Sequence, residues 1–249
     1  MIDLHTHILA GLDDGAATIE DSIGMARAAL ADGITTLAAT PHVREDYPTT
    51  ADEMERGVAA LRAALAAEGL GLQLVPGGEI ALDRLETLDD SELGRFALGG
   101  GRYLLLEFPY RGWPLRLETW TQELYGRGFD VILAHPERNA DATPERLRRL
   151  VEQGVLIQVT SASIDGRLGR NARTAAFKLL ELELAHLIGS DAHAPELRAV
   201  GMRAAADALG DPALATWVTE EVPGAILAGG PVPTRPLARR RGLTRIFRN

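Results

Sequence analysis

Seven short apolar runs recur along this chain, and most of them end in a cluster of histidine and carboxylate residues. The runs are rich in Val, Ile and Leu and do not alternate with polar residues, which is typical of strands buried on both faces of a parallel sheet. Core packing alone does not readily produce such polar endings, so the pattern restricts the fold and the site together. The runs cover residues 2–5, 34–39, 72–75, 103–107, 131–135, 155–160 and 186–190.

Segments with the helical spacing of Ala and Leu separate the apolar runs. The first begins with a capping-box pattern at Thr18, and Gly33 ends it. Strands that alternate with helices predict parallel strands joined by right-handed crossovers, so we expect an α/β fold. The other helical segments cover about residues 51–67, 114–126, 144–152, 171–182 and 196–209.

The positions of the polar clusters favour a closed barrel over an open sheet. They stand at or just beyond the carboxyl ends of the predicted strands, and six of the seven strands contribute. An open doubly wound sheet binds ligands at one switch point, whereas an α/β barrel collects residues from many strand ends at one mouth. We therefore expect a barrel whose mouth holds His5, His7, His42, Glu79, Glu107, His135, Asp191 and His193.

The residue types in these clusters are those of a metal centre without thiolate. Imidazole and carboxylate together suit Zn, Mn or Fe, whereas an all-oxygen set would indicate Mg or Ca. The chain has no cysteine, which excludes a disulfide scaffold and a cysteine nucleophile. We therefore predict a catalytic metal cluster.

Two of the clusters have a spacing that favours metal binding directly. His5 and His7 stand two residues apart, so both side chains point to the same side if the strand continues through them. Asp191 and His193 repeat this spacing after the last strand. Asp191 has an alternative role as a helix cap.

The other candidates keep alternatives when each is considered alone. Glu79 and Glu107 end apolar runs, where an ionised carboxylate needs either a metal or an arginine partner. His42 and His135 are each ligands or loop histidines. Their common location at one barrel edge is what favours the metal site for all four.

Three further polar features are ambiguous. Asp13-Asp14-Gly15 has the local pattern of a turn. Arg138, three residues after His135, is either a solvated cation or a clamp for an oxyanion. His186 precedes a strand, so we assign it a structural or surface role.

Charge and length restrict the class of protein. The formal net charge of −9 argues against a general nucleic-acid binder. With 249 residues the chain can bury a large core, and its longest apolar stretches are far shorter than the roughly 20 residues of a membrane span. The first polar cluster follows Met1 without room for a secretory leader, so we expect a cytoplasmic protein.

The C-terminal segment differs in composition from the rest of the chain. From Gly229 it is rich in glycine and proline, and its end carries clustered arginines. We expect one domain over residues 1–228 and an extended tail over residues 229–249. The tail is either a solvated arm or a contact for an anionic partner or membrane surface.

Taken together, these residues resemble the PHP (polymerase and histidinol phosphatase) metal hydrolases, and most closely the PHP-type protein-tyrosine phosphatases of bacterial capsule and exopolysaccharide clusters. The resemblance covers nearly the whole chain in the right order. Its motifs are residues 1–16, Ala39-Thr40-Pro41-His42, Gly78-Glu79-Ile80, Leu106-Glu107-Phe108, Ala134-His135-Pro136-Glu137-Arg138, Gln158-Val159-Thr160 and Gly189-Ser190-Asp191-Ala192-His193.

The resemblance implies a distorted, TIM-like (β/α)7 barrel that holds three divalent metals, commonly Mn, with Zn, Fe or Co as alternatives. The first ion would take His5, His7, Glu79 and Asp191, and Glu79 would bridge to a second ion held by Glu107 and His135. The third would take Asp14, His42 and His193, which changes the role of Asp14 from turn residue to ligand.

Two arginines also match the family pattern. Arg138 and Arg198 would bind phosphate oxygens. Relatives often have a second histidine after His42, where this chain has Val43-Arg44, so Arg44 is an additional phosphate candidate.

The activity that the resemblance implies is hydrolysis of a phosphomonoester by metal-activated water. The expected substrate is a phosphotyrosine protein, namely the bacterial tyrosine kinase that regulates capsule or exopolysaccharide synthesis. The alternatives are a histidinol-phosphate-type or other small-molecule phosphatase, and an inactive metal-binding regulator of a kinase partner.

Overall fold

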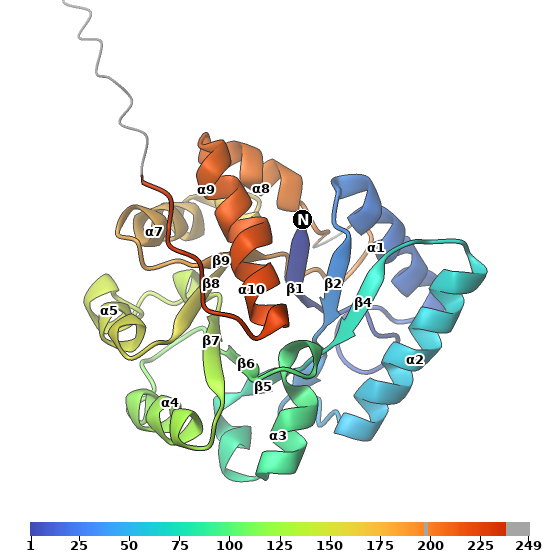
Figure 1. The fold of residues 1–249 in the computed structure, drawn as a ribbon, viewed down its shortest axis with the longest axis horizontal. Helices are drawn as coiled ribbons and strands as arrows, with labels where there is room; N and C mark the ends of the chain where they lie inside the picture. The colour runs from blue at the N-terminus through green and yellow to red at the C-terminus, as the bar shows by residue number, and fades with distance from the viewer. Residues whose placement is uncertain (197–198, 238–249) are drawn as a thin grey trace, which may run out of the picture.

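In the computed structural model, a ring of helices surrounds a set of parallel strands (Figure 1). The structure describes residues 1–196 and 199–237. Its strands are β1 (Ile2–Thr6), β2 (Thr36–Ala39), β3 (His42–Val43), β4 (Gln73–Pro76), β5 (Glu79–Ala81), β6 (Tyr103–Glu107), β7 (Asp130–Ala134), β8 (Leu156–Thr160) and β9 (Leu187–Gly189). Its helices are α1 (Ile19–Asp32), α2 (Ala51–Ala67), α3 (Asp90–Phe96), α4 (Leu117–Gly126), α5 (Pro144–Glu152), α6 (Ser161–Ile164), α7 (Arg170–Glu181), α8 (Met202–Leu209), α9 (Pro212–Thr216) and α10 (Val222–Ala228).

Helix α1 shows how local sequence sets the element boundaries. The Thr18 hydroxyl accepts a hydrogen bond from the backbone N–H of Asp21, and the Asp21 carboxylate accepts one from the backbone N–H of Thr18. Gly33 ends the helix in the left-handed conformation, with φ of 90°. The predicted capping box and glycine stop are both confirmed.

Two strands of the barrel are interrupted: β2 and β3 follow one line, as do β4 and β5. We call each such strand position of the barrel, interrupted or not, a stave. β2 pairs with β4 and β3 pairs with β5, and the register is the same in both pairs, with Ala39 opposite Pro76 and His42 opposite Glu79. Pro41 lies in the gap and has no backbone N–H to donate to the ladder. Each interrupted strand therefore forms one stave, which brings His42 and Glu79 side by side at the carboxyl end.

The two sheets of the barrel are joined at the carboxyl ends of β1 and β9. β1, β2 and β4 form one parallel sheet, and β3 and β5 to β9 form the other. The end of β1 joins the residues after β9, because Asp191 N–H donates to the His5 carbonyl at 2.8 Å and His7 N–H donates to the Ala192 carbonyl at 2.9 Å. Seven staves thus surround one mouth, in agreement with the predicted distorted (β/α)7 barrel within one α/β domain.

The remaining differences from the sequence prediction are local. The helix expected from residue 196 begins only at Met202, since Gly201 before it takes the left-handed conformation with φ of 61°. The short strands β3 and β5 and the helices α3, α9 and α10 were not predicted. All of them are short, so periodicity gave little signal for them.

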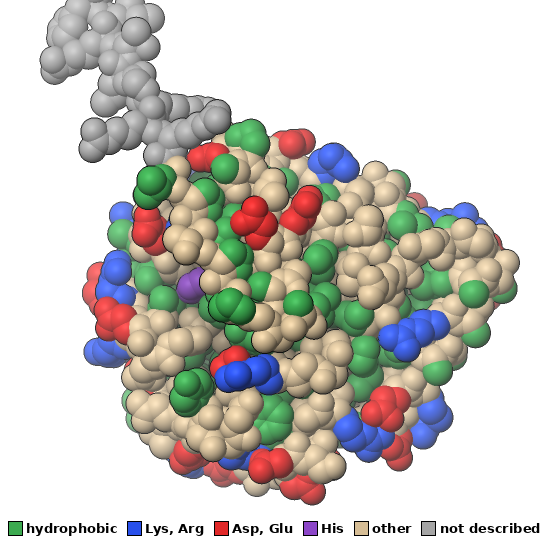
Figure 2. Space-filling view, viewed as in Figure 1, with side chains coloured by type: hydrophobic (Ala, Val, Ile, Leu, Met, Phe, Trp, Pro, Cys, Tyr) green, Lys and Arg blue, Asp and Glu red, His purple; other side chains and the backbone are tan. Residues whose placement is uncertain are grey.

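Helix α10 lies across the amino ends of the strands, on the face opposite the mouth (Figure 1). Acidic and basic side chains are interspersed on this face in Figure 2, without a large area of one sign. The strands themselves are buried on both faces, as every residue of β6 and β8 shows. No helix of the described residues has the length and apolar character needed to cross a membrane.

The first part of the predicted tail lies against the barrel. Trp217 Nε1 donates a hydrogen bond to the Pro233 carbonyl, and the Arg235 guanidinium donates to the carbonyls of Leu180 and Ala185. The clustered arginines at residues 239–248 lie outside the described residues. The domain boundary at Gly229 therefore stays a prediction.

His186 gives the fold a predictable dependence on pH. Its Nδ1 accepts a hydrogen bond from Ile157 N–H at 3.1 Å, and burial, together with nearby Arg235, lowers the pKa of His186 to about 4. The folded chain binds fewer protons than the unfolded chain between this pKa and about 6.5, so the stabilisation is complete above pH 6.5 or so and is lost towards about pH 4.

We expect His186→Asn, which keeps a hydrogen-bond acceptor but cannot be protonated, to reduce the loss of unfolding free energy between about pH 7.5 and pH 5. The full effect of such a pKa shift is at most about 3 kcal/mol. Chemical denaturation of chelator-treated wild type and variant at both pH values measures it. Equal pH dependence in the two proteins would contradict this role for His186.

Candidate metal centre

Side chains from the carboxyl ends of the staves converge at the mouth of the barrel. Eight of the nine predicted metal ligands, all but His135, fall into groups. The ligand atoms of each group lie within 4.8 Å of one another. Asp14 is exposed, and the others lie in the protein interior. The groups are His5, His7, Glu79 and Asp191; His7, Asp14, His42 and His193; and His42, Glu79 and Glu107.

The first group has the spacing of a coordination shell. His5 Nε2 lies 3.3 Å from Glu79 Oε2 and 3.4 Å from Asp191 Oδ1, and His7 Nε2 lies 3.3 Å from each of these oxygens. The two nitrogens are 3.3 Å apart. Atoms that share a tetrahedral ion at about 2.0–2.2 Å lie about 3.3 Å from one another. The four side chains therefore fit a shared metal ion.

Glu79 provides a second test of this fit. It is fully buried, and its Oε2 makes no hydrogen bond within the described part of the chain. A buried carboxylate oxygen without a donor is costly unless it meets a cation. His42 Nδ1 approaches the same oxygen to 3.0 Å, so nitrogens from three histidines surround it.

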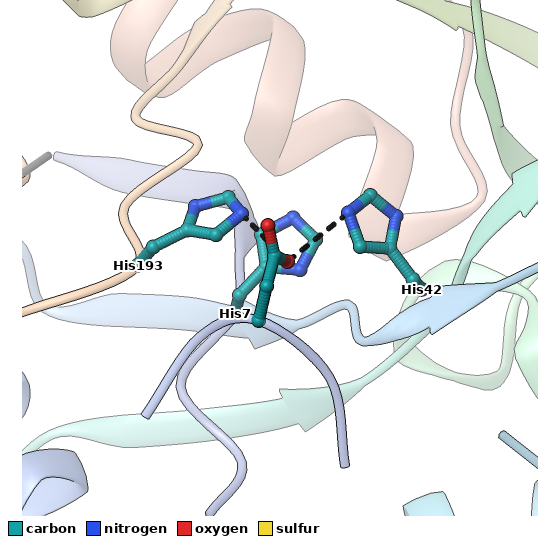
Figure 3. A group of neighbouring side chains, drawn as sticks. His7, His42 and His193 are labelled. Carbon is teal, nitrogen blue, oxygen red and sulfur yellow. Dashed lines mark ion pairs between the residues drawn. The ribbon is translucent and has the colours of Figure 1, made fainter. Parts of the chain in front are cut away.

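A second set of ligand atoms surrounds Asp14. Figure 3 shows His193 and His42 on either side of His7, with their ring nitrogens directed to one carboxylate. Asp14 Oδ1 lies 3.2 Å from His193 Nε2 and 3.4 Å from His42 Nε2. This arrangement agrees with the set of Asp14, His42 and His193 that the family resemblance implied.

The set expected around the second ion, Glu79, Glu107 and His135, is assembled differently. His42 Nδ1 lies 3.8 Å from Glu107 Oε2, so His42, and not His135, completes the group with Glu79 and Glu107. His135 Nε2 approaches Glu79 from the other oxygen, Oε1, at 2.9 Å. The assignment of His135 and Glu107 to one ion therefore stays a prediction.

Three of the histidines are oriented through their second ring nitrogen. Nδ1 of His5 lies 2.9 Å from Gln158 Oε1, and Nδ1 of His7 lies 2.7 Å from Asp13 Oδ2. Nδ1 of His193 lies 2.9 Å from the Asp191 carbonyl. An acceptor at Nδ1 fixes the proton there and leaves the Nε2 lone pair directed into the cluster.

Asp13 is a site residue that sequence reasoning missed. Its Oδ1 accepts from Gly15 N–H at 2.9 Å, so the turn signal in Asp-Asp-Gly is real. Its Oδ2 accepts from the backbone N–H of His42 as well as contacting His7. Burial opposes ionisation, but these bonds lower the pKa of Asp13 to about 2. Nothing in the local spacing separates this role from an ordinary turn.

The electrostatics of the cluster favour added positive charge. Burial raises carboxylate pKa values, yet His5 holds the pKa values of Glu79 and Asp191 well below the usual range. Burial would lower the pKa of His7, but its carboxylate neighbours raise it well above the ordinary value. The carboxylates therefore favour positive charge on the imidazoles beside them, and a bound cation would supply that charge once the ligands deprotonate.

Two of the predicted ligand residues have strained backbones. His135 and Asp191 have φ angles of 39° and 51°, and each stands just after a strand, at the carboxyl end of its stave. Non-glycine residues rarely adopt such positive φ angles, which concentrate at functional sites.

Arg138 lies beside the cluster. Its Nη2 donates to Asp191 Oδ2 at 2.6 Å and to Thr160 Oγ1 at 2.7 Å. Arg44 is bound to Glu107 Oε1 at 2.9 Å on the other side. The third candidate for phosphate binding, Arg198, lies outside the described residues.

Residues 1–216 match the family of capsular polysaccharide synthesis proteins CpsB/CapC. The chain belongs to this family. It is 37% identical over 196 residues to tyrosine-protein phosphatase YwqE of Bacillus subtilis, a match that covers 78% of this chain and 77% of YwqE. It is 33% identical to the putative tyrosine-protein phosphatase CapC of Staphylococcus aureus, over 78% of this chain and 77% of CapC.

A solved structure of the same family has the same fold. It comes from work on YwqE of Bacillus subtilis and CpsB of Streptococcus pneumoniae, which are described as unique metal-dependent tyrosine phosphatases. The TM-score is 0.85 at 32% identity, and the match covers 96% of this chain and all of the solved chain. The family predicted from the sequence motifs is confirmed.

We expect Asp13→Ala to weaken metal binding without unfolding the barrel, because His7 loses the acceptor that fixes its tautomer. Loss of such a partner typically costs about 10- to 100-fold in metal affinity. Asp13→Asn, which keeps an acceptor oxygen, should lose less. Calorimetric titration with Mn²⁺ measures both, and wild-type affinity in Asp13→Ala would contradict the orienting role.

Proposed function

We propose that this chain is a metal-dependent protein-tyrosine phosphatase that hydrolyses the phosphomonoester with metal-activated water. The observation that carries the proposal is the buried set of imidazole and carboxylate atoms around Glu79, at coordination spacing and next to Arg138. The family supports it, since the relatives are named as tyrosine-protein phosphatases.

The proposed ligands are the nine residues of the mouth, and the proposed metal content is three divalent ions, with Mn preferred over Zn, Fe or Co. Bound metals would lower the pKa of a coordinated water towards about 7 and stabilise charge on the attacking and leaving oxygens. The chain contributes the buried carboxylates and the fixed histidine tautomers. It has no cysteine nucleophile to use instead.

Arg138 is the proposed phosphate-binding residue. Its guanidinium reaches the edge of the cluster, where it contacts Asp191 and Thr160 in the structure. A planar guanidinium can donate two parallel hydrogen bonds to a phosphate and offset charge on its oxygens in the transition state. Arg198 would be a second residue that binds phosphate oxygens. The tyrosine leaving group departs as phenoxide, which leaves more readily than an alkoxide.

The proposed substrate is a phosphorylated tyrosine kinase that regulates capsule or exopolysaccharide synthesis, in a cytoplasmic setting. The family description as capsular polysaccharide synthesis proteins supports this partner. The arginines of the tail are the proposed contact for an anionic partner or membrane surface.

A comparison of two phosphomonoesters tests the proposal. With Mn²⁺ present, we expect the full chain to hydrolyse a phosphotyrosine peptide far faster than histidinol phosphate, and chelation to abolish turnover. Hydrolysis of histidinol phosphate alone would favour a small-molecule phosphatase. A protein that binds no transition metal and stays inert after Mn²⁺ addition would favour a regulatory role.

Variants of two arginines provide the matched control. We expect Arg138→Ala to lower kcat/KM for the phosphotyrosine peptide by about 100-fold or more, as loss of a transition-state charge donor does elsewhere. Arg102→Ala removes an exposed arginine that pairs with Asp130 at the amino end of β7, opposite the mouth, and should have no such effect. Wild-type turnover in Arg138→Ala would remove this residue from the site.

A further inference from the structure

Tyr110 presents an aromatic ring at the edge of the metal centre. Its ring lies parallel to that of His135, with the ring centroids 5.8 Å apart and an interplanar angle of 2°. The residue is 53% exposed, although the imidazole beneath it is buried. Core packing does not account for an aromatic ring that is fixed on a candidate ligand and open to solvent on its other side.

The segment that carries Tyr110 is anchored on both sides. Asn139 is buried, and its Nδ2 donates to the carbonyls of Pro109 at 2.6 Å and Gly112 at 2.8 Å. Gly112 N–H in turn donates to Asp141 Oδ2 at 3.0 Å. The turn after β7, which also carries Arg138, therefore sets the position of the Tyr110 ring.

Tyr110 lines a pocket of about 520 Å³ that opens onto the cluster. Arg138, Asp191 and Thr160 line its end at the metal centre, and Arg167 and Glu196 are further charged residues of its lining. Leu168, which is 44% exposed, also lines it and offers an apolar surface. The pocket thus combines a charged end at the metal centre with two exposed apolar side chains.

We propose that Tyr110 and Leu168 form a binding slot for the aryl group of the substrate, while Arg138 and the metal centre hold its phosphate. The inference rests on the proposed function and extends it, because it assigns the preference for an aromatic over an aliphatic phosphomonoester to named side chains. A planar ring can stack on the exposed part of the Tyr110 ring, which lies parallel to the His135 ring.

The ring of Tyr110, and not its hydroxyl, provides this selection. Arg138 Nη1 lies 3.4 Å from the Tyr110 hydroxyl, at the limit of a hydrogen bond. Phenylalanine at this position keeps the stacking face and loses only that weak contact. Alanine removes the face altogether.

Binding of two phosphonates tests the slot without turnover. We measure by calorimetry the affinity of the Mn²⁺-loaded full chain for phenylphosphonate and for methylphosphonate, which differ in the aryl group. An aromatic pair contributes about 0.5–1.5 kcal/mol, so Tyr110→Ala should weaken phenylphosphonate binding about 2- to 12-fold relative to methylphosphonate. Tyr110→Phe should restore the affinity for phenylphosphonate to within about twofold of wild type.

Tyr125→Ala is the matched control, because Tyr125 is exposed near the end of helix α4 and is not among the residues that line the Tyr110 pocket. It should leave both affinities unchanged. Equal loss of both ligands in Tyr110→Ala, or no loss of either, would overturn the slot.

The two proposals fail in different ways. A wild-type chain that hydrolyses a phosphotyrosine peptide and binds both phosphonates, but whose preference for phenylphosphonate persists in Tyr110→Ala, overturns the slot alone. A Mn²⁺-loaded wild type that neither hydrolyses the peptide nor binds phenylphosphonate overturns the proposed function and the slot together.

Discussion

The buried carboxylate of Glu79 is the point on which the rest of the site depends. Its Oε2 lies 3.0 to 3.3 Å from nitrogens of His5, His7 and His42, and it makes no hydrogen bond among the described residues. A charge in the interior of a barrel is expensive without a close partner of opposite sign. The atoms around Glu79 therefore fit the binding of cations. Asp13 and Gln158 fix the tautomers of His7 and His5, which leaves the Nε2 lone pairs available to the same cations.

The irregularity of the barrel serves this arrangement. Pro41 interrupts the second stave, and the strand resumes at His42 opposite Glu79, so one break in the ladder sets two candidate ligands next to each other. The first stave continues past β1 to contact the residues after β9, which brings His7 beside Asp191 and His193. The mouth is thus formed where the strands are least regular.

Much of this could be predicted from the sequence because strand ends in parallel barrels face one mouth. The apolar runs indicated the staves, and the spacing of His5 with His7 indicated that they share one group of ligand atoms. Asp191 and His193 have the same spacing but join different groups. Short elements such as β3 and β5 had too few residues to show a period. Asp13 could not be recognised because its turn and its contact with His7 use the same carboxylate. Asp14 emerged only from the family resemblance, and the place of His42 between two groups depends on the fold. The position of Tyr110 likewise depends on Asn139, far from it in sequence.

Anomalous diffraction from Mn²⁺-loaded crystals shows whether the mouth binds divalent metals around Glu79. We expect one anomalous peak in contact with Glu79, between His5, His7 and Asp191, and a second peak beside Asp14, His42 and His193. Crystals with bound Mn²⁺ elsewhere and none in contact with Glu79 would contradict this expectation.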